Sequence, residues 1–358
     1  MGIQGKNIRV LICDDSPVFR TFINAYLSKK EGIEIIGIAR DAFDAQDKIQ
    51  QLKPDVLSLD VEMPRMNGIE LTKKLMTTSA LPIILVSAAD LSVFDALQAG
   101  AVDIVKKPDA NITSPEAFID ELASKIRIAA IAKVSKSAPI RSAAPGAAVP
   151  PKPAAPIIGA KYSESVASSA IIAIGASTGG TEATLAVLQQ LPAQVPPILV
   201  VQHMPAGFTK LYAERLNKIC AMNVKEAQDG DSVMPGTVYI APGDYQMELI
   251  RWAGGHKLRC TGKEKVSGHC PSVDVLFSSV AKESMKKNIG IILTGMGKDG
   301  ATGLLEMRKK GAYTIGESQE SCVVYGMPMV AQNIGAVMVQ ASNREIAHLL
   351  MKYLSNLS

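Results

Sequence analysis

The chain has 358 residues, more than one typical hydrophobic core organises, so its length predicts two domains. The net charge of +4 is small for this length and gives little support to nucleic-acid binding, which usually needs a clustered basic face. Five scattered cysteines without a C-x-x-C pair disfavour a disulfide framework or a zinc site, and they fit a reducing cytosol.

The sequence predicts a cytoplasmic protein that does not insert into a membrane. The N-terminal segment MGIQGKNIRV lacks the long apolar region of a signal peptide. No apolar run of the sequence approaches the roughly 20 residues that a membrane-spanning helix needs.

Both halves of the chain alternate short apolar runs with longer segments of helical length. This alternation predicts βαβ units and a parallel sheet in each half, hence an α/β fold. The runs of the N-terminal half lie at 8–13, 33–39, 55–60, 82–87 and 102–107. Those of the C-terminal half include 171–176, 197–203, 237–242, 289–295, 312–316 and 335–340. Because ligands of such sheets bind beyond the carboxyl ends of the strands, the residues that follow each run are the candidate site residues.

A segment rich in proline and alanine separates the two halves. Residues 139–156 read PIRSAAPGAAVPPKPAAP, a composition that cannot bury a core and that favours a semi-rigid, extended spacer. We therefore expect an N-terminal domain over 1–126, a basic linker over 127–168 and a C-terminal domain over 169–358.

Polar side chains follow four of the N-terminal runs. Asp14 and Asp15 follow the first run, Asp60 ends the third, Ser87 ends the fourth and Lys107 ends the fifth. Carboxylates packed together repel one another unless a cation lies among them, and oxygen ligands without histidine or cysteine suit magnesium. A lysine and a hydroxyl suit a phosphoryl group. The set predicts magnesium-assisted phosphoryl chemistry with Asp60 as a possible nucleophile.

The same residues carry a family resemblance. The pair DD at 14–15, the segment DVEMPRMNG at 60–68, Ser87 and the pair KP at 107–108 resemble a response-regulator receiver domain over about residues 6–125. The resemblance implies a flavodoxin-like, five-stranded parallel sheet in which a partner histidine kinase phosphorylates Asp60, and Ser87 and Lys107 contact the phosphoryl group. Ile104 stands where many receivers carry an aromatic residue. The magnesium ligands that the resemblance implies are Asp15, Asp60, the backbone carbonyl of Glu62 and, through water, Asp14.

A lone serine on a sharp turn opens the C-terminal half. Ser177 lies in GASTG, which matches G-x-S-x-G between a predicted strand and a predicted helix, the context of a nucleophile elbow. A serine needs a base, and His203 ends the run at 197–203. Asp299, in TGMGKDG, follows another strand and supplies the carboxylate that orients the histidine. The glycines of TGMGKDG could direct backbone N–H groups at a developing oxyanion.

Other interpretations of this serine are weaker. A dinucleotide or phosphate site is disfavoured because GASTGG lacks both G-x-G-x-x-G and a Walker lysine. The chain order of an ordinary α/β-hydrolase would require Ser177, Asp299 and His348, but His348 lies in an amphipathic helical pattern. His256 and His269 lie in a polar, glycine-containing region. We prefer the strand-end residues Ser177, His203 and Asp299.

A second resemblance covers about residues 169–354. The segments GASTGGTEA, QHMPAGFT, YIAPGDYQM, PSVDVLF, ILTGMGKDG and SCVVYGMP resemble the catalytic domain of the chemotaxis methylesterase family CheB. The resemblance implies a doubly wound α/β domain, the Ser177–His203–Asp299 triad, and the backbone N–H of Met296 in the oxyanion hole. It implies hydrolysis of glutamate methyl esters and deamidation of glutamines on chemoreceptors, without a cofactor for the esterase reaction. Cys270 stands where relatives often carry a basic residue.

An esterase and a phosphoryl acceptor on one chain suggest that one controls the other. The resemblance implies that the unphosphorylated receiver covers the active site and that phosphorylation of Asp60 shifts the population towards an open state. Two other classes of function stay open, a phosphorylation-gated binding module with a degenerate site and a small-molecule esterase under receiver control. A DNA-binding response regulator is disfavoured by the size and the glycine-rich strand ends of the second half.

Overall fold

The computed structural model describes residues 6–88, 92–108, 114–134, 169–283 and 287–357. The chain divides into two compact units, 1–142 and 143–358, each with its own parallel sheet. Most of the expected linker, residues 135–168, lies outside the described residues. Within the described part of the chain, no helix is long and apolar enough to span a bilayer.

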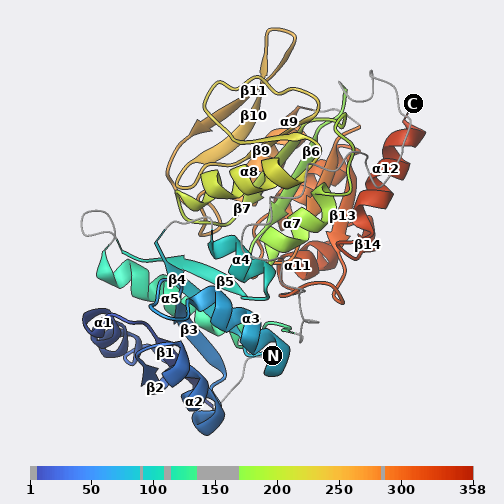
Figure 1. The fold of residues 1–358 in the computed structure, drawn as a ribbon. Helices are drawn as coiled ribbons and strands as arrows, with labels where there is room; N and C mark the ends of the chain where they lie inside the picture. The colour runs from blue at the N-terminus through green and yellow to red at the C-terminus, as the bar shows by residue number, and fades with distance from the viewer. Residues whose placement is uncertain (1–5, 89–91, 109–113, 135–168, 284–286, 358) are drawn as a thin grey trace. The chain divides into compact units, whose positions relative to one another are not determined.

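The N-terminal unit is a five-stranded parallel sheet in the order β2-β1-β3-β4-β5, flanked by helices (Figure 1). Every residue of β3 and β4 is buried, as expected for parallel strands covered on both faces. This architecture confirms the predicted receiver fold. Its strands are β1 (Ile8–Cys13), β2 (Ile33–Ala39), β3 (Val56–Asp60), β4 (Ile83–Ser87) and β5 (Asp103–Lys106). Its helices are α1 (Pro17–Leu27), α2 (Ala42–Leu52), α3 (Gly68–Thr78), α4 (Val93–Gln98) and α5 (Pro115–Ala129).

Local sequence signals fix the helix ends of this unit. Asn67 and Glu70 form a reciprocal capping box at the start of α3, which satisfies two backbone N–H groups that the helix itself leaves unpaired. At the other end of the unit, α5 runs to Ala129, three residues beyond the expected end of the N-terminal domain at residue 126. Its buried face continues through Ile126 to Ala129, so these residues belong to the packed helix.

The C-terminal unit is a seven-stranded parallel sheet in the order β14-β13-β12-β6-β7-β9-β8, with a separate antiparallel hairpin of β10 and β11. The α/β fold expected for this half is therefore confirmed. The sheet strands are β6 (Ile172–Ala176), β7 (Ile198–Gln202), β8 (Asn223–Glu226), β9 (Thr237–Ile240), β12 (Ile289–Ile292), β13 (Tyr313–Glu317) and β14 (Val339–Ala341). The helices are α7 (Gly180–Leu188), α8 (Phe208–Ile219), α9 (Val273–Lys282), α10 (Ala301–Lys309), α11 (Met327–Asn333) and α12 (Ile346–Asn356).

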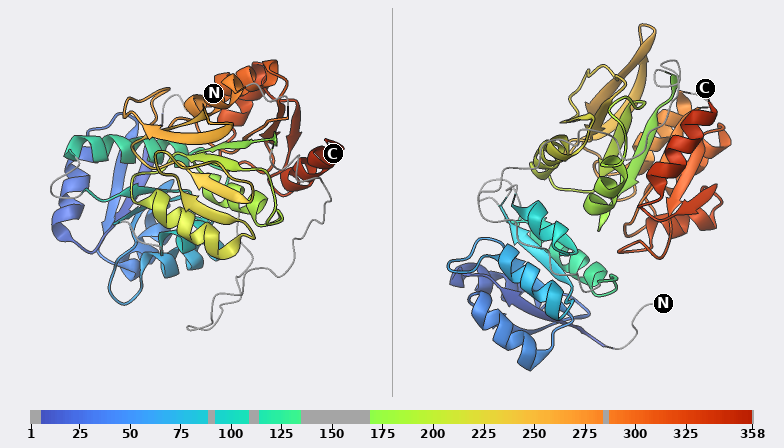
Figure 2. Two further views of the ribbon diagram at one scale, coloured as in Figure 1. Left: turned by 90° about the horizontal axis from the view of Figure 1, so that it is seen from above. Right: turned by 45° about the vertical axis from the view of Figure 1, so that its right-hand side comes forward.

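The chain reverses direction across this sheet between β6 and β12. From β6 it runs to β7, then to the edge strand β8 and back to β9, and from β12 it winds the opposite way through β13 and β14. Helices therefore cover both faces: α7 contacts α12, while α10 contacts both α9 and α11 (Figures 1 and 2). The carboxyl ends of β6 and β12 form a topological switch point, where sheets of this kind place their ligands.

The hairpin of β10 (Gln246–Trp252) and β11 (Gly255–Thr261) extends away from the sheet (Figure 2). Its two central turn residues, Ala253 and Gly254, both have positive φ, as a two-residue hairpin turn requires. Its buried residues Met247, Leu249 and Leu258 join the main core of the unit. The hairpin is thus anchored at its base and exposed at its tip.

A close approach of backbone to side chain joins β6 to α9. A Cβ added to Gly175 would lie 2.1 Å from Cγ1 of Val273, a distance at which something must shift. Glycine at this position therefore lets the first residues of α9 lie directly against the central strand, one residue before the turn that carries Ser177.

We expect Gly175→Ala to destabilise the C-terminal unit by about 1–3 kcal/mol, because the extra methyl group overfills a packed core. Calorimetry of the full chain should show a loss of about 2–4 °C in melting temperature for each kcal/mol. The control is Gly255→Ala, whose added Cβ would meet only the Trp252 carbonyl oxygen at 3.9 Å. Equal melting temperatures of the two variants would contradict the packing argument.

Candidate functional site

Backbone hydrogen bonds hold Ser177 in the turn between β6 and α7. Its N–H donates to the Thr294 carbonyl at 3.0 Å, and its own carbonyl accepts from Gly180 N at 2.7 Å and from Gln202 Nε2 at 2.8 Å. Gly179 has a φ of +78°, a conformation that favours glycine. A Cβ on Gly180 would lie 2.3 Å from Gln202 Oε1, so side chains are excluded there as well. The turn presents a fixed hydroxyl at the switch point.

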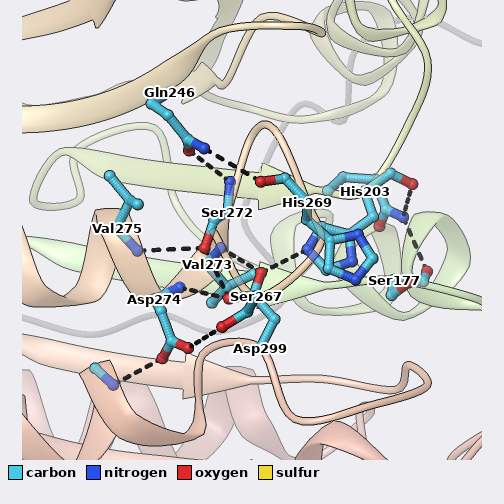
Figure 3. A network of polar contacts seen from close by, with 12 residues as sticks. Ser177, His203, Gln246, Ser267, His269, Ser272, Val273, Asp274, Val275 and Asp299 are labelled. Carbon is cyan, nitrogen blue, oxygen red and sulfur yellow. Dashed lines mark hydrogen bonds and ion pairs between the residues drawn. The ribbon is translucent and has the colours of Figure 1, made fainter. Parts of the chain in front are cut away.

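His203 follows β7, the neighbour of β6, and lies beside Ser177 (Figure 3). Its Nε2 lies 2.8 Å from Asp299 Oδ2. An ionised carboxylate only accepts hydrogen bonds, so Nε2 carries the proton and Nδ1 holds the free electron pair. Nδ1 is buried and has no partner among the described residues. It is therefore the atom available to take a proton from Ser177.

The Asp299 carboxylate lies at the N-terminus of α9 and accepts four hydrogen bonds. Besides His203, the donors are Ser272 Oγ at 2.7 Å, Val273 N at 2.7 Å and Asp274 N at 3.0 Å. Ser272 is also the N-cap of α9. The first N–H groups of a helix have no partner within it and carry partial positive charge, so they stabilise a carboxylate there.

The pKa values of two neighbouring carboxyl groups, Asp299 and Asp274, shift in opposite directions at this helix end. Burial by itself would raise the pKa of Asp299, but the hydrogen bond and charge of His203 and the donors of α9 lower it. The pKa of Asp274 is raised, first by burial and then by the Asp299 charge. Asp299 is thus the member of the pair that stays ionised and can stabilise an imidazolium at His203.

The loop after β12 lies opposite the serine turn and is anchored by Glu317, at the end of β13. The Glu317 side chain is fully buried, and Oε2 accepts from Thr294 N at 2.7 Å. Its Oε1 accepts from Ser321 Oγ at 2.9 Å and from Asn343 Nδ2 at 3.0 Å. Thr294 Oγ1 in turn donates to the Thr178 carbonyl at 3.0 Å. Glu317 therefore holds this loop against the turn that carries Ser177.

Met296 lies in the anchored loop and is half-exposed. Within the described part of the chain, no group accepts a hydrogen bond from its N–H. The neighbouring Gly295 N–H is already used, because it donates to the Val324 carbonyl at 3.0 Å. Of these two donors, the N–H of Met296 is the one that could bind a developing oxyanion.

The strand-end carboxylates of the N-terminal unit also meet. Oxygen atoms of Asp14, Asp15 and Asp60 lie within 4.8 Å of one another, a donor set that fits a divalent cation such as magnesium. Lys107 Nζ lies 3.0 Å from Asp14 Oδ2 and 2.7 Å from Asp60 Oδ2. Ser87 is fully buried, and no described group hydrogen-bonds to its Oγ.

An open cavity of about 610 Å³ lies over this carboxylate cluster. Asp15, Asp60, Glu62 and Lys107 line it together with residues of the 61–69 loop. Burial, opposed by Lys107 and reinforced by the Asp14 charge, raises the pKa of Asp60 to about 6. Ile104, which occupies the position that is aromatic in many receivers, is buried in β5.

The structure brings the predicted residues into two clusters, one in each unit. Ser177, His203, Asp299 and Met296 meet at the switch point, while His348 lies on α12. The sequence pattern did not indicate Ser272 or Glu317, whose side chains hold other residues of the site. It also gave no role to His269, whose ring stacks on His203. The N-cap pattern S-x-x-V at the start of α9 was the one available signal for Ser272.

Comparisons with known proteins agree with this geometry. Residues 172–350 match the family described as CheB methylesterase, and residues 10–114 match the response regulator receiver domain. A relative from Syntrophomonas wolfei, named protein-glutamate methylesterase/protein-glutamine glutaminase 2, is 48% identical over 98% of this chain and 99% of its own. The chain belongs to the CheB methylesterase family. Membership confirms the predicted ester hydrolase with an N-terminal receiver domain.

Two further relatives of the CheB family support this assignment. The protein-glutamate methylesterase/protein-glutamine glutaminase of Salmonella typhimurium is 44% identical over 93% of both chains. Among solved structures, the CheB methylesterase catalytic domain of Thermotoga maritima is 40% identical, with a TM-score of 0.50 over 51% of this chain and 97% of its own. The C-terminal unit of this chain thus has the fold of a CheB catalytic domain.

We expect Glu317→Ala to slow the reaction of Ser177 with a fluorophosphonate probe and to destabilise the fold by about 1–3 kcal/mol, because the buried Thr294 N–H loses its acceptor. The labelling rate and the folding free energy of Glu317→Gln should stay close to those of wild type. Its amide oxygen can still accept from Thr294 N, while the Ser321 hydroxyl can rotate and the Asn343 amide can turn so that their oxygens accept from the new NH2 group. Glu283→Ala, which removes a carboxylate paired with Arg251, is the control. An unchanged labelling rate in Glu317→Ala would contradict the anchoring role.

We expect the receiver unit to lose stability as the pH rises from about 5 to about 7 without divalent cations. The pKa of Asp60 is raised from 3.8 to about 6 on folding, so the folded state holds a proton that the unfolded state has released. The bound proton therefore stabilises the folded state, and this stabilisation is lost as the pH rises from about 4 through the folded pKa of about 6. Between pH 5 and pH 7 the loss is on the order of 1–2 kcal/mol. Asp60→Asn should remove this dependence of stability on pH.

Amide hydrogen exchange of β1 and β3 in the full chain would measure the effect, with Asp55→Asn as the matched surface control. Asp55 lies outside the cluster, where it accepts from the Arg9 N–H. An identical pH slope in wild type and Asp60→Asn would show that Asp60 does not cause it.

Proposed function

We propose that this chain demethylates glutamate methyl esters and deamidates glutamines on chemoreceptors, and that phosphorylation of Asp60 activates it. The observation that carries the catalytic part is the buried, unpartnered Nδ1 of His203, whose Nε2 is held by Asp299. The His203 side chain lies beside Ser177 (Figure 3). The names of its close relatives supply the two substrates.

The ester reaction follows from this geometry. Ser177 attacks the side-chain carbonyl carbon while its proton passes to Nδ1 of His203, and Asp299 stabilises the imidazolium that forms. The backbone N–H of Met296 binds the oxyanion. His203 then gives the proton to the departing methoxide, and methanol leaves. Water attacks the acyl-serine, with His203 again accepting the proton, and the free carboxylate is released.

Phosphorylation would occur in the N-terminal unit. Asp60 is the carboxylate nucleophile, Lys107 and Ser87 hold the phosphoryl oxygens, and a partner histidine kinase is the donor. Magnesium would be held by Asp15, Asp60 and the Glu62 carbonyl, with Asp14 acting through water. When bound, the ion neutralises charge on the transferring group.

The remaining assignments follow the sequence. We assign 1–126 to the receiver, 127–168 to the linker and 169–358 to the catalytic domain, with the linker beginning inside the last turn of α5, which ends at Ala129. A cytoplasmic location agrees with the five free cysteines, of which four are buried. No cofactor is assigned to the esterase reaction.

The direct test is methanol release from methylated chemoreceptor membranes with magnesium, with and without a small phosphodonor. We expect the donor to raise the rate, Asp60→Asn to abolish that rise, and Ser177→Ala to lower the rate by about 10³-fold or more. Deamidation should be slower than demethylation, because an unprotonated amide nitrogen leaves less readily than methoxide and needs a proton from His203 before it can depart as ammonia.

Ser163→Ala, a serine of the predicted linker, is the control for the serine substitution. Turnover retained in Ser177→Ala would refute the triad. Hydrolysis of soluble esters without any release from receptors would favour a small-molecule esterase. A rate of methanol release that is the same with and without the phosphodonor would refute control by the receiver.

A further inference from the structure

A second histidine ring lies flat against the base. The imidazoles of His203 and His269 are nearly parallel, with an interplanar angle of 9° and centroids 3.7 Å apart (Figure 3). His269 comes from the segment between the hairpin and α9, about 65 residues further along the chain. Nothing in the reaction described above uses its ring.

Several hydrogen bonds fix the turn that carries His269. Val266 and His269 exchange backbone hydrogen bonds of 3.0 and 2.9 Å. Gln246 Nε2 donates to the His269 carbonyl at 3.2 Å, while Gln246 Oε1 accepts from Ser272 N at 2.8 Å. Ser267 Oγ donates to Asp274 Oδ2 at 3.1 Å. The turn is therefore bound to the same helix end that holds Asp299.

The hydrogen bond to Asp299 leaves one motion of His203 weakly restrained. Rotation of an imidazole about its Cβ–Cγ bond is a broad torsion with no deep wells. Nε2 lies nearer to that axis than Nδ1 does, so the same rotation displaces Nδ1 further than Nε2, and the bond to Asp299 resists the rotation only in part. A parallel ring in contact with one face blocks this rotation directly.

We propose that His269 is a positioning residue, whose ring fixes the plane of His203 so that Nδ1 faces Ser177. The role needs a flat ring and not a titrating nitrogen, so an aromatic hydrocarbon should replace it. The inference rests on the proposed function for its natural substrate, but the activation of Ser177 can be measured without that substrate.

The test compares His269→Ala with His269→Phe in the full chain. We measure the rate of Ser177 labelling by a fluorophosphonate probe, and kcat and KM for methanol release. Alanine should lower the labelling rate and kcat about tenfold to a hundredfold and leave KM within about twofold, as expected when a catalytic group is misplaced. Phenylalanine should restore both rates to within about threefold of wild type.

The matched control is His256→Ala, which removes a histidine that pairs with Glu283 at 3.3 Å on the hairpin. Phenylalanine as slow as alanine would overturn the proposal, because a ring nitrogen would then be required. An alanine variant within about twofold of wild type would overturn it as well. If wild type is labelled but releases no methanol from receptors, the proposed function fails, and the labelling rates of the variants still decide the role of His269.

Discussion

The catalytic unit depends on one interaction, the carboxylate of Asp299 held at the N-terminus of α9. That helix end supplies two backbone N–H groups and the Ser272 hydroxyl, and the fourth donor is Nε2 of His203. The donors keep a largely buried carboxylate ionised, which burial alone would neutralise. Gly175 permits the arrangement, because any side chain there would push α9 away from β6. Packing and electrostatics are therefore set by the same contact between strand and helix.

The surroundings of the buried carboxylates in the two units shift their pKa values in opposite directions. Asp299 is surrounded by donors, which lower its pKa, whereas Asp60 shares a single lysine with Asp14 and has a raised pKa. The first arrangement suits a group that must remain charged and stationary throughout a reaction. The second suits a group that gains from a cation or a covalent modification, because either relieves the repulsion between the carboxylates.

Much of both sites could be predicted from the sequence, because their reactive residues directly follow apolar runs. Parallel strands bring Ser177, His203 and Asp299 to one sheet edge independently of the conformation of the loops. Ser272, Glu317 and His269 could not be found in this way. They act through contacts that span 23 residues or more, as in the bond of Glu317 to Thr294 or the stack of His269 on His203, and no periodicity marks them. The hairpin strands β10 and β11 were missed because their apolar faces are short.

The eight residues from Ser267 to Asp274 limit where insertions and deletions can occur among homologues. The stacked ring, the cap of α9 and three of the four donors to Asp299 lie within this segment, so an insertion or deletion would displace all of them at once. The hairpin tip at Ala253 and Gly254 is joined to the same core but exposed. Variation in chain length among homologues should therefore concentrate at the tip, leaving the spacing from Ser267 to Asp274 constant.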